Sequence, residues 1–249
     1  MKITAIIPTL NEEIYIEEAI KSVNFADEVI IIDSYSTDDT LVIAEKYNVK
    51  IIQRVFDDYS SQKNFAISKA KHDWVFLLDA DEKITSELRE ELNILFEEEP
   101  KKDAYWIYRT NYFMGRKIKY SGWKNDKVIR FFNRYKCAYN GKLVHERIDV
   151  NGETGVIKSR FNHYPYKNFD HYVGKLNKYA LLQAKMLLKD NNKLNGFHFV
   201  IKPLFRFINH YFLKLGFLDG RPGLVIAVLK SYGVFARYTK LWLLKRELK

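Results

Sequence analysis

The chain has 249 residues, of which 47% are apolar and 29% charged, a composition typical of a globular protein and not of a disordered or fibrous one. A single cysteine, Cys137, excludes an internal disulfide framework and a cysteine-based metal cluster. The formal net charge of +10 divides into 10 Lys+Arg against 22 Asp+Glu in residues 1–100 and 31 against 9 in residues 101–249, which excludes a uniformly basic polyanion binder.

The first hundred residues alternate between apolar strands and helical patterns. We expect strands over 3–7, 28–33, 50–53 and 74–78, and helices over 12–23, 37–47, 59–70 and 86–96. Continuous apolar strands separated by helices are typical of an α/β fold with a mostly parallel sheet covered on both faces.

The pattern changes after residue 100. Aromatic strand-like pieces over 104–108, 127–132 and 156–160, mixed with glycine turns, predict antiparallel strands, and a helix is expected over 168–190. Two amphipathic segments follow, separated at Gly216–Gly223. We therefore expect three parts: a ligand-binding half over 1–100, a second half over 101–190, and a basic helical extension over 195–249.

No segment has the pattern of a signal peptide or a membrane span. Pro8 ends the apolar N-terminal run, and the longest uninterrupted apolar stretch is Leu224–Leu229, far below the roughly 18 residues of a spanning helix. The sequence thus predicts a cytoplasmic location.

Polar side chains follow three of the four expected parallel strands. Pro8 and Thr9, Asp33, and the Asp79-Ala80-Asp81 segment stand at strand carboxyl ends, where ligands bind in open α/β sheets. All eleven glycines lie at or after Gly115, so the first strand–helix turn is not a glycine-rich phosphate loop. If a nucleotide binds there, we expect a divalent metal on carboxylates to neutralise its phosphates.

Asp79, Asp81 and Glu82 place three carboxylates within four residues directly after a buried strand. Such carboxylates repel one another unless a cation is present, and their oxygens suit Mg²⁺ or Mn²⁺. A solvated acidic turn that caps the next helix is the alternative. For Asp33, acceptance of a hydrogen bond from a base N–H competes with a purely structural role.

Four motifs in this order resemble the nucleotide-sugar half of family 2 glycosyltransferases, which have the GT-A fold. They are Ile6-Ile7-Pro8-Thr9-Leu10-Asn11-Glu12-Glu13, Asp33-Ser34-Tyr35-Ser36-Thr37-Asp38-Asp39-Thr40, Gln62-Lys63-Asn64 and Asp79-Ala80-Asp81-Glu82. Three later motifs resemble the branch of lipopolysaccharide-core β-1,4-glucosyltransferases: Gly141-Lys142-Leu143-Val144-His145-Glu146, Asn162-His163-Tyr164 and Gly216-Phe217-Leu218-Asp219-Gly220. Tyr35 and Asp39 depart from the glycines that the commonest form of the second motif carries.

The resemblance implies a metal-dependent, inverting hexosyltransferase that uses a nucleotide sugar, UDP-glucose above all, and a lipid-linked saccharide such as the inner-core heptose of lipopolysaccharide. It implies that the nucleoside contacts Pro8, Thr9, Glu12 and Asp33. It also implies that Lys63 approaches the diphosphate, and that Asp79 and Asp81 lie at the ribose and at Mg²⁺ or Mn²⁺. The metal would screen charge on the departing nucleoside diphosphate.

An inverting transfer needs a base for the acceptor hydroxyl. Glu146 is our candidate catalytic base, because acids are scarce after residue 100; Asp126 and Asp149 are rivals, and an ion pair with Arg147 is the structural alternative. Two further expectations concern the ligands. The resemblance implies that His163 reaches the metal or diphosphate, unless it is structural, and Trp123 is expected to stack on the acceptor sugar, although core packing explains such aromatics equally well.

Residues 195–249 carry ten Lys+Arg and two acids and have an amphipathic pattern. This favours peripheral binding to an anionic membrane surface over helices packed on the catalytic part with solvated lysines. Three alternatives stay open at this point: the same fold acting on another glycan (capsule, exopolysaccharide or glycoprotein), a basic nucleic-acid-binding protein, and a non-catalytic membrane scaffold.

Overall fold

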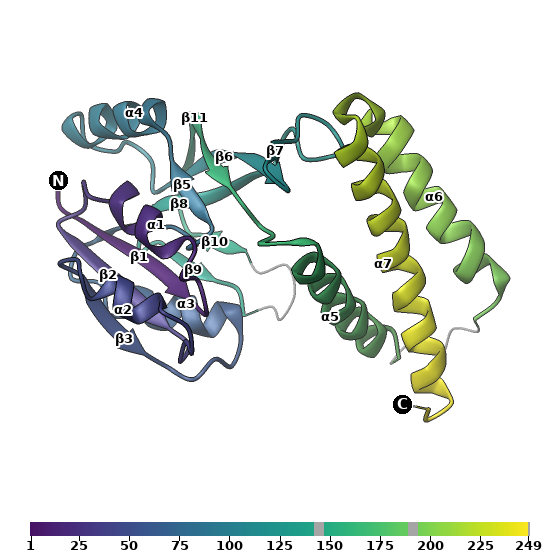
Figure 1. Cartoon of the computed structure of the whole chain (residues 1–249). Coiled ribbons are helices and arrows are strands. Elements are labelled where there is room, and N and C mark those ends of the chain that lie inside the picture. The colour runs from purple at the N-terminus through teal and green to yellow at the C-terminus, as the bar shows by residue number, and fades with distance from the viewer. Residues whose placement is uncertain (142–146, 189–193, 249) are drawn as a thin grey trace. The chain divides into compact units, whose positions relative to one another are not determined.

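The computed structural model describes residues 1–141, 147–188 and 194–248 (Figure 1). Packing divides the chain into two compact units. Unit 1 comprises Met1–Arg109 and Lys127–His163, and unit 2 comprises Thr110–Asp126 and Tyr164–Lys249. The three parts expected from the sequence (1–100, 101–190 and 195–249) are defined by motifs and charge and not by packing, so that division stays a prediction.

Unit 1 is built on a mixed sheet whose first four strands are parallel, in the order β3-β2-β1-β4. The sheet continues through antiparallel strands in the order β8-β6-β11-β5. The strands are β1 (Ile3–Thr9), β2 (Glu28–Asp33), β3 (Lys50–Gln53), β4 (Trp74–Leu77), β5 (Glu82–Ile84), β6 (Ala104–Phe113), β8 (Lys127–Asn133) and β11 (Thr154–His163). A separate hairpin pairs β9 (Cys137–Tyr139) with β10 (Ile148–Val150).

Helices cover both faces of the parallel strands, as the continuous apolar strands predict (Figure 1). They are α1 (Ile16–Ser22), α2 (Thr40–Ala44), α3 (Tyr59–Ser68) and α4 (Ser86–Glu97). Alternate residues of β1 face opposite sides, so that Ala5 and Ile7 pack with α1, while Ile6 packs with Ala66 and Ile67 of α3. The expected α/β fold is therefore confirmed.

Two helices of unit 1 begin later than the sequence predicts. The segment over 12–15 forms a turn, because Asn11 adopts a left-handed φ of 56° and its side chain binds the chain after β2. Helix α2 begins at Thr40, since Asp38 bonds to the amide and hydroxyl of Thr40 and holds the preceding turn outside the helix. Polar contacts between the two loops thus replace the first turn of each expected helix.

Unit 2 is mainly helical. It contains the short strand β7 (Arg116–Lys117), which pairs with Tyr112 and Phe113, the end of β6 that belongs to the same unit. Its other elements are α5 (Phe169–Leu188), η1 (Phe197–Ile201), α6 (Lys202–Ile208), η2 (Asn209–Leu213), η3 (Gly216–Asp219) and α7 (Arg221–Lys245). Elements η1, α6 and η2 form one continuous helix with π-type turns at both ends, and α7 packs against both that helix and α5 (Figure 1). Among the described helices, none combines the length and apolar character that a bilayer crossing requires.

The Gly216-to-Gly220 motif forms η3 and joins η2 to α7 in unit 2. A Cβ on Gly223 would lie 1.8 Å from the carbonyl oxygen of Gly216, so only glycine permits this approach of α7 to η3. The Asp219 carboxylate accepts hydrogen bonds from the amides of Lys119 (2.9 Å) and Tyr120 and from the Ser121 hydroxyl. The motif therefore fixes the loop before Trp123 onto the helical region.

Candidate active site

Asp33 organises the carboxyl ends of β1 and β2. These strands are in register, with Thr9 opposite Asp33. The buried Asp33 carboxylate accepts hydrogen bonds from the Thr9 hydroxyl (3.2 Å), the Ser36 amide (2.9 Å) and hydroxyl, and the Gln53 amide group (3.3 Å). Its oxygens are thus already engaged by protein donors, and a contact with a nucleobase stays a prediction.

The loops after β1 and β2 are tied to each other. The Asn11 amide donates to the Ser36 hydroxyl (2.9 Å), and the Asn11 side-chain oxygen accepts from the Thr37 amide (2.8 Å). The Glu12 amide donates to the Thr40 hydroxyl (2.7 Å). Of the four expected nucleoside contacts, Pro8, Thr9 and Asp33 therefore lie at the carboxyl ends of β1 and β2, and Glu12 lies on the loop that follows β1.

Helix α3 directs three consecutive side chains to three different elements. Gln62 donates to the hydroxyl of Ser34 in the loop after β2 (3.1 Å), and Asn64 exchanges two hydrogen bonds with the backbone of Tyr139 on β9 (2.9 and 3.0 Å). Between them, the Lys63 ammonium lies 3.2 Å from Asp79 Oδ1, with only 8% of its side chain exposed. The neighbours of Lys63 therefore hold its cation at the end of β4.

Asp79 is the centre of a buried charge cluster after β4. Its Oδ1 pairs with Lys63, and its Oδ2 accepts a hydrogen bond from the Arg130 guanidinium on β8. The same guanidinium nitrogen lies 2.6 Å from Glu82 Oε1, and the Asp79 amide donates to Glu82 Oε2 (3.1 Å). Arg109 adds a second cation 3.7 Å from Glu82. The cluster fixes the Asp79-to-Glu82 segment against the neighbouring antiparallel strand.

Burial and opposite charges act in opposite directions on these groups. Burial would raise the pKa of Asp79, but the cations of Arg130 and Lys63 outweigh it and hold that pKa well below its usual range. Burial dominates at Glu82 and raises its pKa, although Arg130 is adjacent. Asp79 is therefore a permanent anion, with 29% of its side chain exposed, at the edge where a ligand would enter.

Asp81 and His163 form the part of the site that suits a cation. Asp81 Oδ2 lies 3.7 Å from His163 Nε2, because β5 and β11 pair antiparallel with His163 opposite Glu82. A divalent ion binds oxygen and nitrogen ligands at about 2.0–2.2 Å, so one ion fits between two donors at this separation. In the described part of the chain no group of three or more acidic, histidine or cysteine ligands converges, so water or bound phosphate oxygens would have to complete the shell.

The metal assignment of Asp79 is less direct than that of Asp81. Both Asp79 oxygens already contact cations of the protein, so a metal would bind them alongside Lys63 and Arg130 or in place of one of these cations. A role of Asp79 in holding these cations beside the donor needs neither arrangement. Its assignments to ribose and metal stay predictions.

The sequence motifs do not predict Arg130 or its contact with Glu82. Arg130 is 3% exposed and stands between the buried Ile129 and Phe131 on β8. A cation inside an apolar strand is a usable signal, because a buried guanidinium requires a carboxylate partner. The sequence does not say which of 31 acids that partner is.

The structure describes some but not all of the residues expected on the acceptor side. Glu146, the candidate base, lies outside the described residues. Its rivals lie in different units: Asp149 is exposed on β10 in unit 1, whereas Asp126 accepts a hydrogen bond from Asn111 (3.0 Å) in unit 2. Trp123 packs in unit 2 against Phe113 and other aromatics, so its contact with an acceptor sugar stays a prediction.

Comparison with known proteins agrees with the family resemblance of the sequence motifs. The family profile described as glycosyl transferase family 2 matches residues 4–145. An uncharacterised glycosyltransferase of Rickettsia conorii is 32% identical over 260 residues, which cover 96% of this chain and 89% of that protein. The lipopolysaccharide core biosynthesis glycosyltransferase LpsC of Rhizobium meliloti is 26% identical over 252 residues, 96% of this chain and 93% of that protein.

Among solved structures, the chain is similar to residues 1–349 of S. aureus TarS in complex with UDP-GlcNAc. The superposition has a TM-score of 0.51 at 17% identity and covers 100% of this chain and 93% of that one. At this identity the likeness concerns the fold, and it confirms the expected GT-A architecture with a helical C-terminal region.

Proposed function

The chain belongs to glycosyltransferase family 2, and from this premise we propose that it moves a hexose, glucose from UDP-glucose, onto a lipid-linked saccharide with inversion at the sugar carbon. The observation that carries the proposal is the cluster after β4. There Lys63 and Arg130 flank the Asp79 carboxylate at the same sheet edge as the Thr9–Asp33 loops. A nucleoside and a diphosphate need this combination of polar loops and cations.

In the proposed donor complex the loops after β1 and β2 receive the nucleoside, and Lys63 faces the diphosphate. Its Nζ is oriented by Asp79, so the cation is in place before the donor binds. Such preorganised charge stabilises the anion that grows as the bond between the sugar carbon and the phosphate oxygen breaks.

Asp81 and His163 would hold the divalent ion, Mg²⁺ or Mn²⁺, against that diphosphate. When bound, the ion supplies Lewis-acid stabilisation of the departing nucleoside diphosphate. His163 must be neutral to ligate, and Asp81 supplies the negative charge.

On the opposite face of the sugar, the acceptor oxygen forms the new bond to the sugar carbon and loses its proton to the base. We assign this base to Glu146, with Asp126 and Asp149 as rivals, and the acceptor contact to Trp123. The name of LpsC supports a lipopolysaccharide-core acceptor, and inner-core heptose is the proposed residue. Another glycan is the competing acceptor class.

We further propose that the enzyme works in the cytoplasm as a peripheral protein on an anionic membrane. Support comes from the basic composition of residues 195–249 and from the exposed apolar side chains of α6 and α7. Family membership favours this enzyme over the nucleic-acid-binding and scaffold alternatives.

Calorimetric titration with UDP-glucose, in the presence and absence of Mn²⁺, tests the donor site. We expect Mn²⁺-dependent binding that weakens at least about tenfold in Lys63→Met, since a charge-assisted hydrogen bond contributes about 1.5–3 kcal/mol. The matched control is Lys69→Met at the exposed C-terminal end of the same helix. Absence of binding by UDP-glucose and by UDP-N-acetylglucosamine would remove the proposal.

The base is tested separately, with donor and acceptor glycolipid both present. Glu146→Gln should abolish transfer and leave UDP-glucose affinity unchanged, whereas Asp149→Asn should retain turnover. Normal turnover of Glu146→Gln would eliminate the assignment and turn attention to Asp126.

A further inference from the structure

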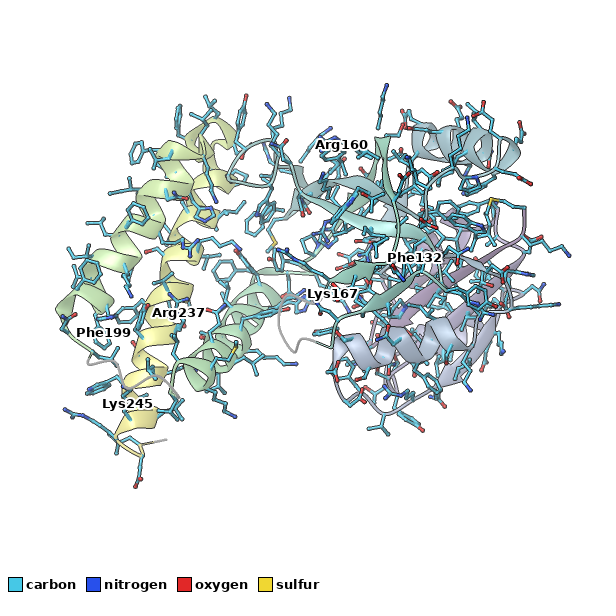
Figure 2. All side chains as sticks on the ribbon, turned by 180° about the vertical axis from the view of Figure 1, so that it is seen from behind. Phe132, Arg160, Lys167, Phe199, Arg237 and Lys245 are labelled. Atoms are coloured by element: carbon cyan, nitrogen blue, oxygen red, sulfur yellow. The ribbon has the colours of Figure 1, made fainter. Side chains whose placement is uncertain are left out.

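A groove of about 620 Å³ runs between the helix formed by η1 and α6 and the facing side of α7, entirely within unit 2. Figure 2 shows Arg237 on α7 and Phe199 on the neighbouring helix. Its lining includes Phe197, Ile201, Lys202, Phe205, Arg206 and Arg237. None of the donor-site residues belongs to it.

Three of the lining side chains are cations and none is an acid. Lys202 donates to the Tyr238 hydroxyl (2.8 Å) and lies over its ring, and Arg237 donates to Gln183 (3.1 Å). The buried Nε of Arg237 has no hydrogen-bond partner among the described residues. In the sequence, Asp219 is the only acid between residues 195 and 246, and it is engaged by the loop at Lys119–Ser121.

The positive charge of this region is concentrated rather than balanced. Burial, and then the neighbouring cations Arg206 and Lys214, lower the pKa of Lys230 on α7. The same cations and Lys230 add to burial in lowering the pKa of His210. Of these cations Arg206 also lines the groove, so an anion in the groove would offset part of the repulsion that the free protein carries.

Apolar side chains stand beside these cations. Phe197, Ile201 and Phe205 are four residues apart, so they share one side of the helix, and they are 52%, 47% and 61% exposed. A small inorganic anion would satisfy the cations but would leave this row in water. The ligand that fits both features carries a phosphate and a hydrocarbon chain.

We propose that the groove binds the phosphate headgroup of an anionic membrane phospholipid, with Lys202, Arg206 and Arg237 around the phosphate and Phe197, Ile201 and Phe205 against the acyl chains. This inference deepens, and rests on, the membrane-bound part of the proposed function. A second copy of the chain is a poor occupant, because a symmetric interface on this face brings like charges together. The groove would hold unit 2 on the lipid surface in one orientation.

The test is sedimentation of the full chain with vesicles of phosphatidylcholine that contain or lack phosphatidylglycerol. The groove variant is Lys202→Gln/Arg206→Gln/Arg237→Gln. The matched control, Arg221→Gln/Lys240→Gln/Arg246→Gln, removes the same charge from residues of α7 and its C-terminus that do not line the groove. Circular dichroism verifies that both variants keep the wild-type helix content.

We expect the partition coefficient on phosphatidylglycerol vesicles to fall about a hundredfold in the groove variant, because each of the three cations contributes roughly a fivefold factor. In the control variant it should fall less than tenfold. Phe205→Ser should weaken binding in the same vesicles even at high salt. Equal losses in the two triple variants, with wild-type binding intact, would overturn the headgroup site and leave peripheral binding standing.

Three other results would overturn the inference in different ways. If the wild type ignores both kinds of vesicle, the membrane-bound part of the proposed function fails together with the groove. If soluble glycerol phosphate protects the protein against thermal unfolding as strongly as the vesicles do, the groove is a site for free phosphate. A wild-type dimer that the groove variant abolishes would make the face a self-association surface.

Discussion

Replacement of Arg130 by methionine is the sharpest test of the charge cluster after β4. The substitution keeps most of the side-chain volume but removes the cation that contacts both Asp79 and Glu82. Glu82 has a side chain with no exposure, and its other cation, on Arg109, is 3.7 Å away. Arg130→Met therefore leaves a buried carboxylate without its close partner.

The cost follows from this geometry. Removing one partner of a buried, hydrogen-bonded ion pair costs about 3–5 kcal/mol, since the other charge stays desolvated. The free energy of unfolding of a domain is about 5–15 kcal/mol, so this loss is a large fraction of it. In the double variant Arg130→Met/Glu82→Gln the buried charge is gone, and Asp79 retains Lys63. We expect the free energy of unfolding of that variant to fall by only about 1–2 kcal/mol, because only a neutral amide then lacks a hydrogen-bond partner.

Urea unfolding followed by tryptophan fluorescence and circular dichroism measures these differences. Arg116→Met, at an exposed position of β7, is the control and should stay within about 0.5 kcal/mol of the wild type. If Arg130→Met also remains within about 1 kcal/mol, or if the double variant is no more stable than the single one, the cluster does not have the energetic role described here.

Three further predictions concern stability and reactivity. Burial lowers the pKa of His210 to about 4, so the folded state favours the neutral ring. The free energy of unfolding should therefore be highest above the unfolded pKa of about 6.5 and should fall by roughly 2–4 kcal/mol as the pH drops from 6.5 to 4. In urea unfolding, His210→Asn should lack this pH dependence. Gly223→Ala should destabilise by about 3 kcal/mol or more, because the new Cβ meets the Gly216 carbonyl, while Gly174→Ala in α5, where nothing lies within 4 Å, should stabilise by up to about 1 kcal/mol; the reverse order of the two melting temperatures would refute this. Burial raises the pKa of the Cys137 thiol to about 12, so Ellman's reagent at pH 8 should modify the folded protein at least about a hundredfold more slowly than the unfolded one, and comparable rates would show that the thiol is accessible.

Sequence periodicity predicts most of the secondary structure correctly because the strands and long helices bury continuous apolar faces. The strand at Lys50–Gln53 has the predicted bounds, and α4 begins at the predicted Ser86, after the capping residue Thr85. The errors occur where side chains bond to backbone across loops. The Asn11 side chain accepts from the Thr37 amide, 26 residues away, and Asp38 accepts from the Glu13 amide, 25 residues away, in addition to its local bonds with Thr40.

The candidate site likewise has one part that the sequence predicts and another part that depends on tertiary contacts. Motif order locates Thr9, Asp33, Lys63 and Asp79 at one sheet edge, since parallel strands from one sheet end together. The part played by Arg130 depends on β8 lying antiparallel beside β4, a pairing of residues more than fifty positions apart. No local pattern encodes that pairing.

The sequence by itself determined the α/β fold, the family and the split between an acidic first hundred residues and a basic remainder. The fold follows from periodicity and the charge split from composition, whereas the family follows from the resemblance of motifs. Only the tertiary structure decided which charges meet. It surrounded Asp79 with Lys63 and Arg130, placed Asp81 within 3.7 Å of His163, and gathered Lys202, Arg206 and Arg237 around one groove. Charge interactions depend on distance and burial, which chain position does not specify.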